Sequence, residues 1–319
     1  MQAVVIHAPK DLRIDSFPDT MPDAGEVRVK IAAGGICGSD LHYYHHGGFG
    51  TVRIQQPMAL GHEISGVIAA VGSGVSHLAP GMRVAVNPSQ PCGACLHCRE
   101  GMHNQCLDMR FMGSAMRMPH VQGGFREHVT VDAAHAGKQA GPLLGKRVLV
   151  TGCGPIGALM VIVARYGGAA EVVVTDIADA PLAVARKLGA SRTVNTATEV
   201  SALDPYRVGK GTFDVLFEAS GNQAALRSAL DLLRPGAIIV QVGLGGEMTL
   251  PINTIVAKEL QLRGTFRFDP EFELALRLMG AGPIDVKPLI TASLPFAAAV
   301  DAFELASDRS KSMKVQLTF

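Results

Sequence analysis

The chain has 319 residues, more than a single hydrophobic core usually holds, so we expect two domains. Hydrophobic residues make up 48% and charged residues 18%, which favours packed sheets over disorder. The 29 basic and 28 acidic residues nearly cancel, which argues against a nucleic-acid partner. No apolar run reaches the ~20 residues of a membrane helix, and no export signal precedes the first apolar run. We therefore expect a cytoplasmic protein with a small-molecule ligand.

The predicted elements change in character along the chain. Up to about residue 135 the segments are short and strand-like, with period-two alternation at 26–31 and frequent glycine and proline. From residue 147 strands alternate with helices, which predicts a parallel, doubly wound sheet in an α/β protein. The expected strands are 148–150, 172–174, 213–217 and 237–242, and the expected helices are 156–166, 181–188 and 223–233.

After residue 266 the alternation ends. Two further helices, at 271–279 and 297–305, and a last strand at 314–317 remain. We expect this tail to rejoin the first domain. The predicted division is therefore a mainly β domain at 1–138, a nucleotide-binding domain at 139–266, and the returning tail at 267–319.

Four of the six cysteines lie in one fifteen-residue loop with the spacing C-x2-C-x2-C-x7-C. Short intervals allow one loop to deliver four thiolates to a tetrahedral zinc ion, and such a closed site holds structure. Disulfides are the alternative, but the clustering and the absence of a secretion signal favour zinc. The predicted ligands are Cys92, Cys95, Cys98 and Cys106.

A glycine-rich turn, Gly152-x-Gly154-x-x-Gly157, follows a predicted strand and opens a helix, with Pro155 and Ile156 inside it. Such a turn lets the pyrophosphate of a dinucleotide approach the helix N-terminus. Asp176 ends the next strand, where a carboxylate accepts hydrogen bonds from the ribose hydroxyls and repels a 2′-phosphate, so we expect NAD. The alternative for Asp176 is a helix N-cap or turn residue.

Cys37, His62 and Glu63 offer zinc a thiolate, an imidazole and a carboxylate, and they leave one tetrahedral position open for an alcohol. Each also has an ordinary interpretation, such as a buried thiol or a core histidine. The residues that follow Cys37 favour catalysis. We expect Ser39 to accept the alcohol proton, Asp40 to orient His62, and His42 to relay the proton, whereas His45 and His46 are predicted to lie in a solvated loop.

These motifs resemble the zinc-dependent medium-chain dehydrogenases of the polyol group. Residues 35–44 (GICGSDLHYY) resemble the catalytic-zinc segment of sorbitol dehydrogenases, and Gly61-His62-Glu63 and the four-cysteine loop resemble two further signatures. Residues 43–50 and 111–117 resemble the L-idonate 5-dehydrogenase branch.

The resemblance implies a GroES-like catalytic domain, a Rossmann domain, two zinc ions per chain, NAD, and a homodimer or homotetramer. It implies oxidation of a secondary alcohol in a sugar acid or polyol, with threonine as an alternative substrate. It also places Val242, Gly243, Leu244 and Phe266 beside the cofactor and Arg267 at the substrate, with Arg110, Arg117 and Arg126 as weaker candidates.

One departure from the resemblance lies at residues 135–140. The family carries a connecting segment here that supplies a glutamate near the catalytic zinc and bridges the two domains. About two dozen residues are absent, more than an ordinary loop deletion. We predict a shortened or engineered chain joined at Gly137-Lys138, and an inactive scaffold that binds zinc and nucleotide is the alternative to an enzyme.

Overall fold

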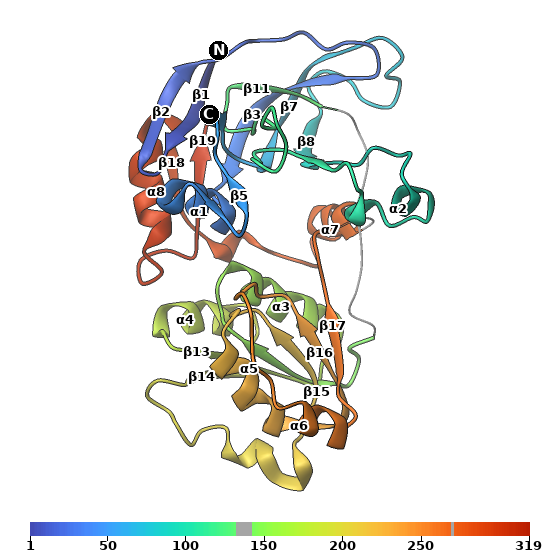
Figure 1. The fold of residues 1–319 in the computed structure, drawn as a ribbon, viewed down its shortest axis with the longest axis vertical. Coiled ribbons are helices and arrows are strands. Elements are labelled where there is room, and N and C mark those ends of the chain that lie inside the picture. Colours follow the sequence, from blue (N-terminus) through green and yellow to red (C-terminus); the bar gives the residue numbers. More distant parts are fainter. Residues whose placement is uncertain (132–141, 269–270) are drawn as a thin grey trace.

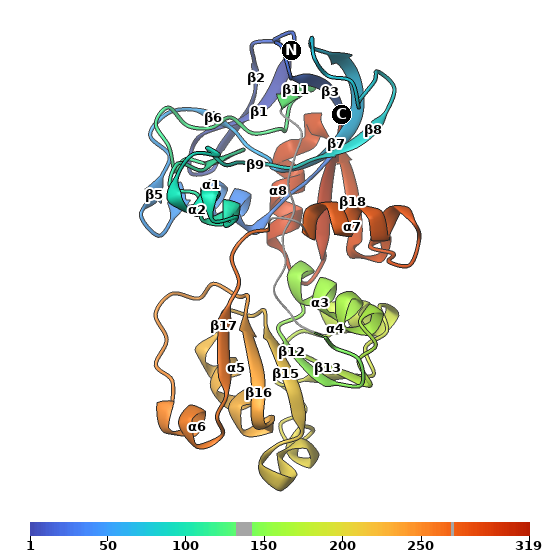
Figure 2. The same ribbon diagram turned by 90° about the vertical axis from the view of Figure 1, so that its right-hand side faces the viewer.

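The computed structural model describes residues 1–131, 142–268 and 271–319. Two bodies lie one above the other along the long axis (Figure 1). The upper body is built from the N-terminal strands together with the C-terminal segment, and the lower body contains the middle of the chain (Figure 2). No helix in the described ranges is long and apolar enough to cross a membrane.

The upper body is organised around strand β3 (Val27–Gly35). Val27, Val29 and Ile31 of this strand are buried, in line with the predicted alternation. Along one side β3 pairs antiparallel with β7 (Glu63–Val71). Along the other side it pairs with β11 (His128–Val131) near its start and with β19 (Lys314–Thr318) near its end. The strand order is β18-β19-β3-β7-β8, so the C-terminal strands extend the N-terminal sheet.

Shorter elements complete the upper body and the crossover, the segment after β17 through which the chain returns from the lower body to the upper body. A second sheet has the order β2-β1-β6, and the pairs β4-β5 and β9-β10 are separate. The strands are β1 (Gln2–Ala8), β2 (Asp11–Ser16), β4 (Gly48–Phe49), β5 (Val52–Arg53), β6 (Met58–Ala59), β8 (Arg83–Val86), β9 (Ser89–Gln90), β10 (Arg110–Phe111) and β18 (Ile290–Pro295). The helices are α1 (Gly38–His46), α2 (Leu96–Arg99), α7 (Glu271–Gly280) and α8 (Ala299–Ser307), with 3-10 turns η1 (His103–Gln105), η4 (Lys287–Leu289) and η5 (Phe296–Ala298).

One hydrophobic core holds the two ends of the chain together. Fully buried Ile31 of β3 and Phe125 share this core with Phe303 of α8 and Leu317 of β19. Burial of a large apolar side chain contributes about 1.5–3 kcal/mol, so these contacts fix the C-terminal segment on the N-terminal sheet.

The lower body is a six-stranded sheet in the order β14-β13-β12-β15-β16-β17, with every described pair parallel. This is the 3-2-1-4-5-6 order of a doubly wound dinucleotide-binding fold. Helices α3 and α4 cover one face and α5 the other, so the prediction of an α/β protein with a doubly wound parallel sheet is confirmed. The elements are β12 (Arg147–Thr151), α3 (Pro155–Tyr166), β13 (Glu171–Asp176), α4 (Asp179–Lys187), β14 (Arg192–Asn195), η2 (Asp204–Lys210), β15 (Phe213–Glu218), α5 (Gln223–Ala229), η3 (Leu230–Leu232), β16 (Leu233–Gln241), α6 (Ile252–Ala257) and β17 (Gln261–Gly264).

Three features of the lower body differ from the sequence prediction. The helix expected over 223–233 ends at Ala229 and tightens into a 3-10 turn, and strand β16 already begins at Leu233. Pro235 and Gly236, which has φ +75°, follow at once and cannot continue a helix. The edge strands β14 and β17 were not predicted, because their four residues each are too short for a periodic signal.

Candidate functional site

The register of β3 and β7 assembles the first cluster. Gly35 of β3 lies opposite Glu63 of β7, so Cys37, two residues beyond Gly35, lies beside His62 and Glu63. One ligand atom from each of these three residues lies within 4.8 Å of the others. Small adjustments would allow all three to reach one zinc ion at about 2.0–2.3 Å. The structure therefore brings together the three predicted ligands.

Two glycines make room for this cluster. A Cβ atom on Gly35 would lie 2.6 Å from Oε2 of Glu63, so only glycine leaves the carboxylate in place. Gly61 has φ +94°, and a Cβ there would lie 2.2 Å from the ring of Phe125. The chain must turn sharply at Gly61 for His62 to face Cys37.

Electrostatics of the cluster favour a cation. Burial opposes a charge on the His62 imidazole, but Asp40 and the thiol of Cys37 outweigh it and raise the pKa of His62 to about 9. His62 is 8% exposed, and its Nδ1 has no hydrogen-bond partner in the described structure. A buried orphan nitrogen beside a thiol and two carboxylates fits a zinc site.

The arrangement of Asp40 differs from the predicted one. Its carboxylate lies 3.7 Å from Nδ1 of His62, beyond hydrogen-bond distance. It instead accepts hydrogen bonds from the backbone N–H groups of Cys37 (2.9 Å) and Gly61 (3.2 Å). Asp40 thus fixes the two backbone segments that carry the ligands, and it acts on His62 through its charge.

The polar residues of the predicted relay lie on α1. Cys37 is the N-cap of this helix, and Ser39 and His42 follow at helical spacing i, i+3, which places them on one face. His42 is exposed and reaches solvent. The prediction of a solvated loop for His45 and His46 was wrong, because both lie in α1, and Nε2 of His45 is 2.6 Å from the hydroxyl of Ser307.

The four-cysteine loop forms a separate cluster. The sulfur atoms of Cys92, Cys95, Cys98 and Cys106 lie within 4.8 Å of one another. Backbone N–H groups of Leu107 and Cys98 lower the pKa of Cys95 to about 6, which favours the thiolate that metals bind. The apolar contacts of this lobe consist of the cysteines, Met109 and Phe111, too few to hold a loop without a metal.

The glycine-rich turn joins β12 to α3, and its three glycines serve different ends. Gly152 has φ +81°, and a Cβ there would lie 2.7 Å from the backbone of Ser220. A Cβ on Gly157 would lie 1.9 Å from the carbonyl of Gly152, so this glycine permits close packing of helix and turn. Gly154 is the N-cap of α3 and supplies no side-chain cap, while Pro155 takes the first helical position. The helix N-terminus, continued by Ile156, can therefore receive an anion.

Asp176 lies at the carboxyl end of β13, and its hydrogen bonds are those of a turn residue, the alternative interpretation; its contact with the ribose stays a prediction. Its Oδ2 accepts a hydrogen bond from the N–H of Cys153 (2.7 Å), and its Oδ1 accepts from Ile177 (2.7 Å) and Ala178 (3.1 Å). The carboxylate therefore organises its own turn and ties it to the glycine-rich turn. No basic residue follows, since the next charged residue is Asp179.

Glu218, at the carboxyl end of β15, is a site residue that sequence reasoning missed. It is fully buried, and its carboxylate accepts hydrogen bonds from Ser220, Gly221 and Gln241. The N–H groups of Val242 and Gly243 donate to its backbone carbonyl, and Leu244 follows with 89% exposure. The signal was a charged residue ending an apolar strand, FDVLFE.

The crossover at Phe266 and Arg267 meets the upper body. Arg267 has φ +58°, and its guanidinium lies 5.0 Å from the ring centre of Phe111 and 4.8 Å from that of Phe266. The Phe111 ring is 5.4 Å from the His62 ring, so Phe111 connects Arg267 to the first cluster, and Arg267 also donates to the sulfur of Met116 (3.3 Å). No carboxylate in the described part of the chain pairs with Arg267. Burial lowers its pKa, so a bound anion would relieve the cost of its charge.

Comparisons with known proteins agree with this geometry. Residues 23–141 match the family described as alcohol dehydrogenase GroES-like domain, and residues 155–281 match the zinc-binding dehydrogenase family. L-idonate 5-dehydrogenase (NAD(P)(+)) of Escherichia coli strain K12 is 42% identical, with 91% of each chain covered. The chain belongs to the zinc-dependent medium-chain dehydrogenase family, in its polyol group.

Solved structures support the same assignment. A crystal structure of L-idonate 5-dehydrogenase from E. coli K-12 superposes on this dehydrogenase with a TM-score of 0.94 and 39% identity, covering 100% of this chain and 98% of that one. An E. coli CFT073 alcohol dehydrogenase complexed with NADH gives a TM-score of 0.87 at 31% identity, covering 100% and 99%. The prediction of zinc and a nicotinamide dinucleotide as cofactors is confirmed at the level of the family.

The alignment also bears on the length of this dehydrogenase. The 316 aligned positions with the E. coli relative include 91% of the 319 residues, or about 290, so about 26 positions have no counterpart in this chain. This deficit agrees in size with the expected absence of a connecting segment. The predicted junction at Gly137-Lys138 lies outside the described residues.

The weaker arginine candidates have other partners in this dehydrogenase. Arg117 donates to the carbonyls of Met109 and Leu107 and thereby braces the four-cysteine lobe. Arg126 packs over the ring of Phe17, away from the first cluster, and burial lowers its pKa to about 10. Arg110 is exposed on β10. Of the four arginines, Arg267 is the one whose guanidinium lies over Phe111, the ring that contacts His62.

Proposed function

We propose that this chain oxidises a secondary alcohol of a sugar acid with NAD, and that L-idonate, oxidised to 5-dehydro-D-gluconate, is the leading substrate. The observation that carries the proposal is the guanidinium of Arg267, which pairs with no carboxylate among the described residues and lies over Phe111, a ring that contacts His62; it also donates to the sulfur of Met116 (3.3 Å). An arginine in this position suits the carboxylate of a sugar acid, because its fork binds a carboxylate with two parallel hydrogen bonds. The name of the 42% identical relative, L-idonate 5-dehydrogenase (NAD(P)(+)), supports the same choice.

We assign the remaining site residues by chemistry. Cys37, His62 and Glu63 would hold the catalytic zinc, and Cys92, Cys95, Cys98 and Cys106 the structural zinc. When bound, zinc acts as a Lewis acid that lowers the pKa of an alcohol, and the nicotinamide accepts the hydride. Ser39 takes up the alcohol proton and His42 passes it to solvent, since the two lie on one face of α1, where Ser39 is half-buried and His42 is exposed.

The preference for NAD rests on Asp176. A carboxylate at the end of β13 accepts hydrogen bonds from ribose hydroxyls and repels a 2′-phosphate, and no arginine or lysine stands beside it. Gly152, Gly154, Pro155, Ile156 and Gly157 receive the pyrophosphate, and Val242, Gly243, Leu244 and Phe266 border the nicotinamide.

We further propose the domain boundaries 1–138, 139–266 and 267–319 and assembly as a homodimer or homotetramer. A second candidate function is a scaffold that binds zinc and nucleotide without turnover. The observation that favours it is the deficit of about 26 aligned positions, which is large enough to remove an interdomain segment.

A single assay distinguishes the two candidate functions. Zinc content is measured on purified protein, and NADH formation is followed with L-idonate, sorbitol and threonine as substrates. Two zinc ions per chain and turnover fastest on L-idonate support the proposal. Turnover fastest on sorbitol or threonine would change the substrate class, and NAD binding without turnover on any alcohol would favour the scaffold.

A further inference from the structure

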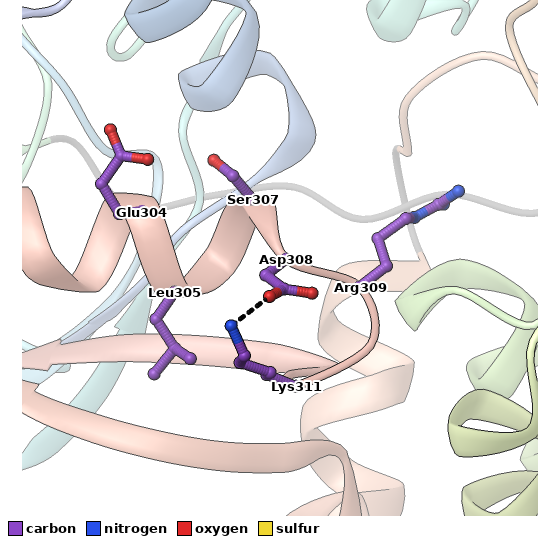
Figure 3. Close-up of a pocket in the computed structure, with 6 residues that line it drawn as sticks. All are labelled: Glu304, Leu305, Ser307, Asp308, Arg309 and Lys311. Carbon is purple, nitrogen blue, oxygen red and sulfur yellow. Dashed lines mark ion pairs between the residues drawn. The ribbon is translucent and has the colours of Figure 1, made fainter.

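The turn that follows α8 borders an open hollow of about 730 Å³ in the C-terminal segment. The residues that line it are Glu304, Leu305, Ser307, Asp308, Arg309 and Lys311 (Figure 3). In that view Arg309 points away from Asp308 and Lys311, which face each other, toward the side on which α3 lies. The turn therefore presents one arginine outward.

Hydrogen bonds within the turn fix its shape and occupy its carboxylate. Asp308 accepts from the hydroxyl of Ser310 (2.6 Å), from the N–H of Ser310 (3.0 Å) and from Nζ of Lys311 (2.7 Å). The backbone carbonyl of Asp308 accepts from the N–H groups of Lys311 and Ser312. Because Asp308 is satisfied within the turn, it does not pair with the adjacent Arg309.

Arg309 is exposed and forms no ion pair or hydrogen bond within the described ranges, yet it lies at the glycine-rich turn. A Cβ atom built on Gly154 would be 3.2 Å from Nη2 of Arg309, and no other atom would be within 4 Å of that Cβ. The open side of Gly154 is thus bordered by a guanidinium from the turn after α8, a helix that packs on the other body. The N-terminus of α3 begins at the same residue.

We propose that Arg309 binds the pyrophosphate of the dinucleotide, as a residue delivered to the glycine-rich turn by the catalytic body. The inference rests on the proposed use of a dinucleotide and extends it to a named cation. An N-terminal helix end provides backbone N–H groups and partial positive charge, but the turn itself carries no basic side chain. Arg309 supplies the full charge and a planar fork that matches phosphate oxygens.

This arrangement also links binding to the relative position of the two bodies. The pyrophosphate would contact α3 of the lower body and Arg309 of the upper body at once. A dinucleotide then contributes an interaction that adenosine, which lacks phosphate, cannot make.

The test compares the binding of four probes to the wild-type protein and to Arg309→Gln, Arg309→Lys and Lys187→Gln. The probes are NADH, followed by its fluorescence, and ADP, 2′-AMP and adenosine, followed by calorimetry. Lys187 is the charge-matched control, since it is exposed at the C-terminal end of α4 and forms no ion pair with a residue that the structure describes. Circular dichroism and the melting temperature establish that each variant is folded.

We expect Arg309→Gln to weaken the binding of NADH and of ADP about tenfold or more, because a charge-assisted contact is lost. Adenosine and 2′-AMP should bind as in the wild type, Arg309→Lys should recover part of the loss, and Lys187→Gln should change nothing. These results together would support a contact with the pyrophosphate.

Three outcomes would overturn the inference. The first is unchanged affinity of Arg309→Gln for NADH and ADP. The second is an equal loss for adenosine, which would indicate that Arg309 only positions the two bodies. The third is a loss of affinity for 2′-AMP while the affinity for ADP is unchanged. Wild-type protein that binds ADP but not NADH would contradict the proposed function alone, because the ADP arm still tests Arg309; binding of neither would overturn both.

Discussion

Glu63 and Lys314 form an ion pair beside the candidate catalytic metal site, although 251 positions separate them in the sequence. Nζ of Lys314 also donates to the carbonyl of Ile36 at 2.9 Å. Burial opposes the charged ammonium, but Glu63 and Cys37 outweigh it and raise the pKa of Lys314. Zinc with one thiolate and one carboxylate ligand is neutral, so Lys314 balances the remaining buried carboxylate, Asp40.

This charge balance predicts a metal-dependent effect of Lys314→Met. In the metal-free protein the change removes the ammonium partner of Glu63 and leaves the protonated His62 as the cation of the cluster. We expect a loss of about 2 kcal/mol in the free energy of unfolding, less than for a fully buried pair because the Glu63 side chain is 39% exposed. With zinc bound, the ion supplies positive charge and the loss should be smaller.

Thermal unfolding with zinc and with a chelator measures the difference. The rise in melting temperature on adding zinc should be larger for Lys314→Met than for the wild type. Lys314→Arg, which keeps the charge, should resemble the wild type. An equal loss of stability in both metal states would indicate that Lys314 serves packing alone.

The four-cysteine lobe predicts a local effect of metal loss. In Cys98→Ser we expect the zinc content to fall by one ion per chain, because a hydroxyl is a poor substitute for a thiolate. The lobe has few apolar contacts, so residues 92–106 should become accessible to limited proteolysis. Cys153→Ser is the control, since Cys153 lies apart in the glycine-rich turn and should leave the zinc content unchanged. Retention of both zinc ions by Cys98→Ser would contradict the assignment.

The sequence predicted the site where its signals are local. The spacing of the four cysteines and the turn at Gly152 each lie within one short segment, so spacing alone identified them. Cys37 and His62 were grouped by the ligand types they offer zinc and by the residues that follow Cys37, with the family resemblance as further support, and in the structure the β3–β7 register brings them together.

The remaining site residues depend on tertiary contacts. Lys314 and Arg309 reach the site because the tail packs on the first domain, and no short-range pattern marks either residue. The sequence indicated Glu218 only weakly, through a charged residue at the end of an apolar strand. Its role in holding the surrounding loop is evident only from the hydrogen bonds that its carboxylate accepts in the structure.

Cofactor preference should respond to a change beside Asp176. Ile177 follows it and is 75% exposed, so Ile177→Arg should fold normally. The added guanidinium would attract a 2′-phosphate, and we expect the affinity for NADPH relative to NADH to rise about tenfold, or 1.4 kcal/mol. Leu144→Arg, at a site 80% exposed just before the amino-terminal end of β12, adds the same charge far from the carboxyl end of the parallel strand β13, where Asp176 lies, and should not alter the ratio. Titration of cofactor fluorescence gives both affinities, and an unchanged ratio in Ile177→Arg would place the ribose elsewhere.

Substrate choice should depend on Arg267. In Arg267→Gln the guanidinium over Phe111 is lost, and a sugar-acid carboxylate loses its charged partner. We expect kcat/KM for L-idonate to fall about 10- to 100-fold, which corresponds to roughly 1.4–2.7 kcal/mol. Sorbitol has no carboxylate, so its kcat/KM should change much less.

The contrast between the two substrates separates charge recognition from structural damage. Arg263→Gln is the matched control, because Arg263 lies three residues from the crossover turn and bonds to Gln261 at 2.6 Å, and it should leave both substrates unaffected. Arg267→Lys should recover only part of the activity on L-idonate, since an ammonium cannot reproduce the two-pronged contact. If Arg267→Gln lowers kcat/KM equally for both substrates, the arginine supports the fold of the crossover and the carboxylate binds elsewhere.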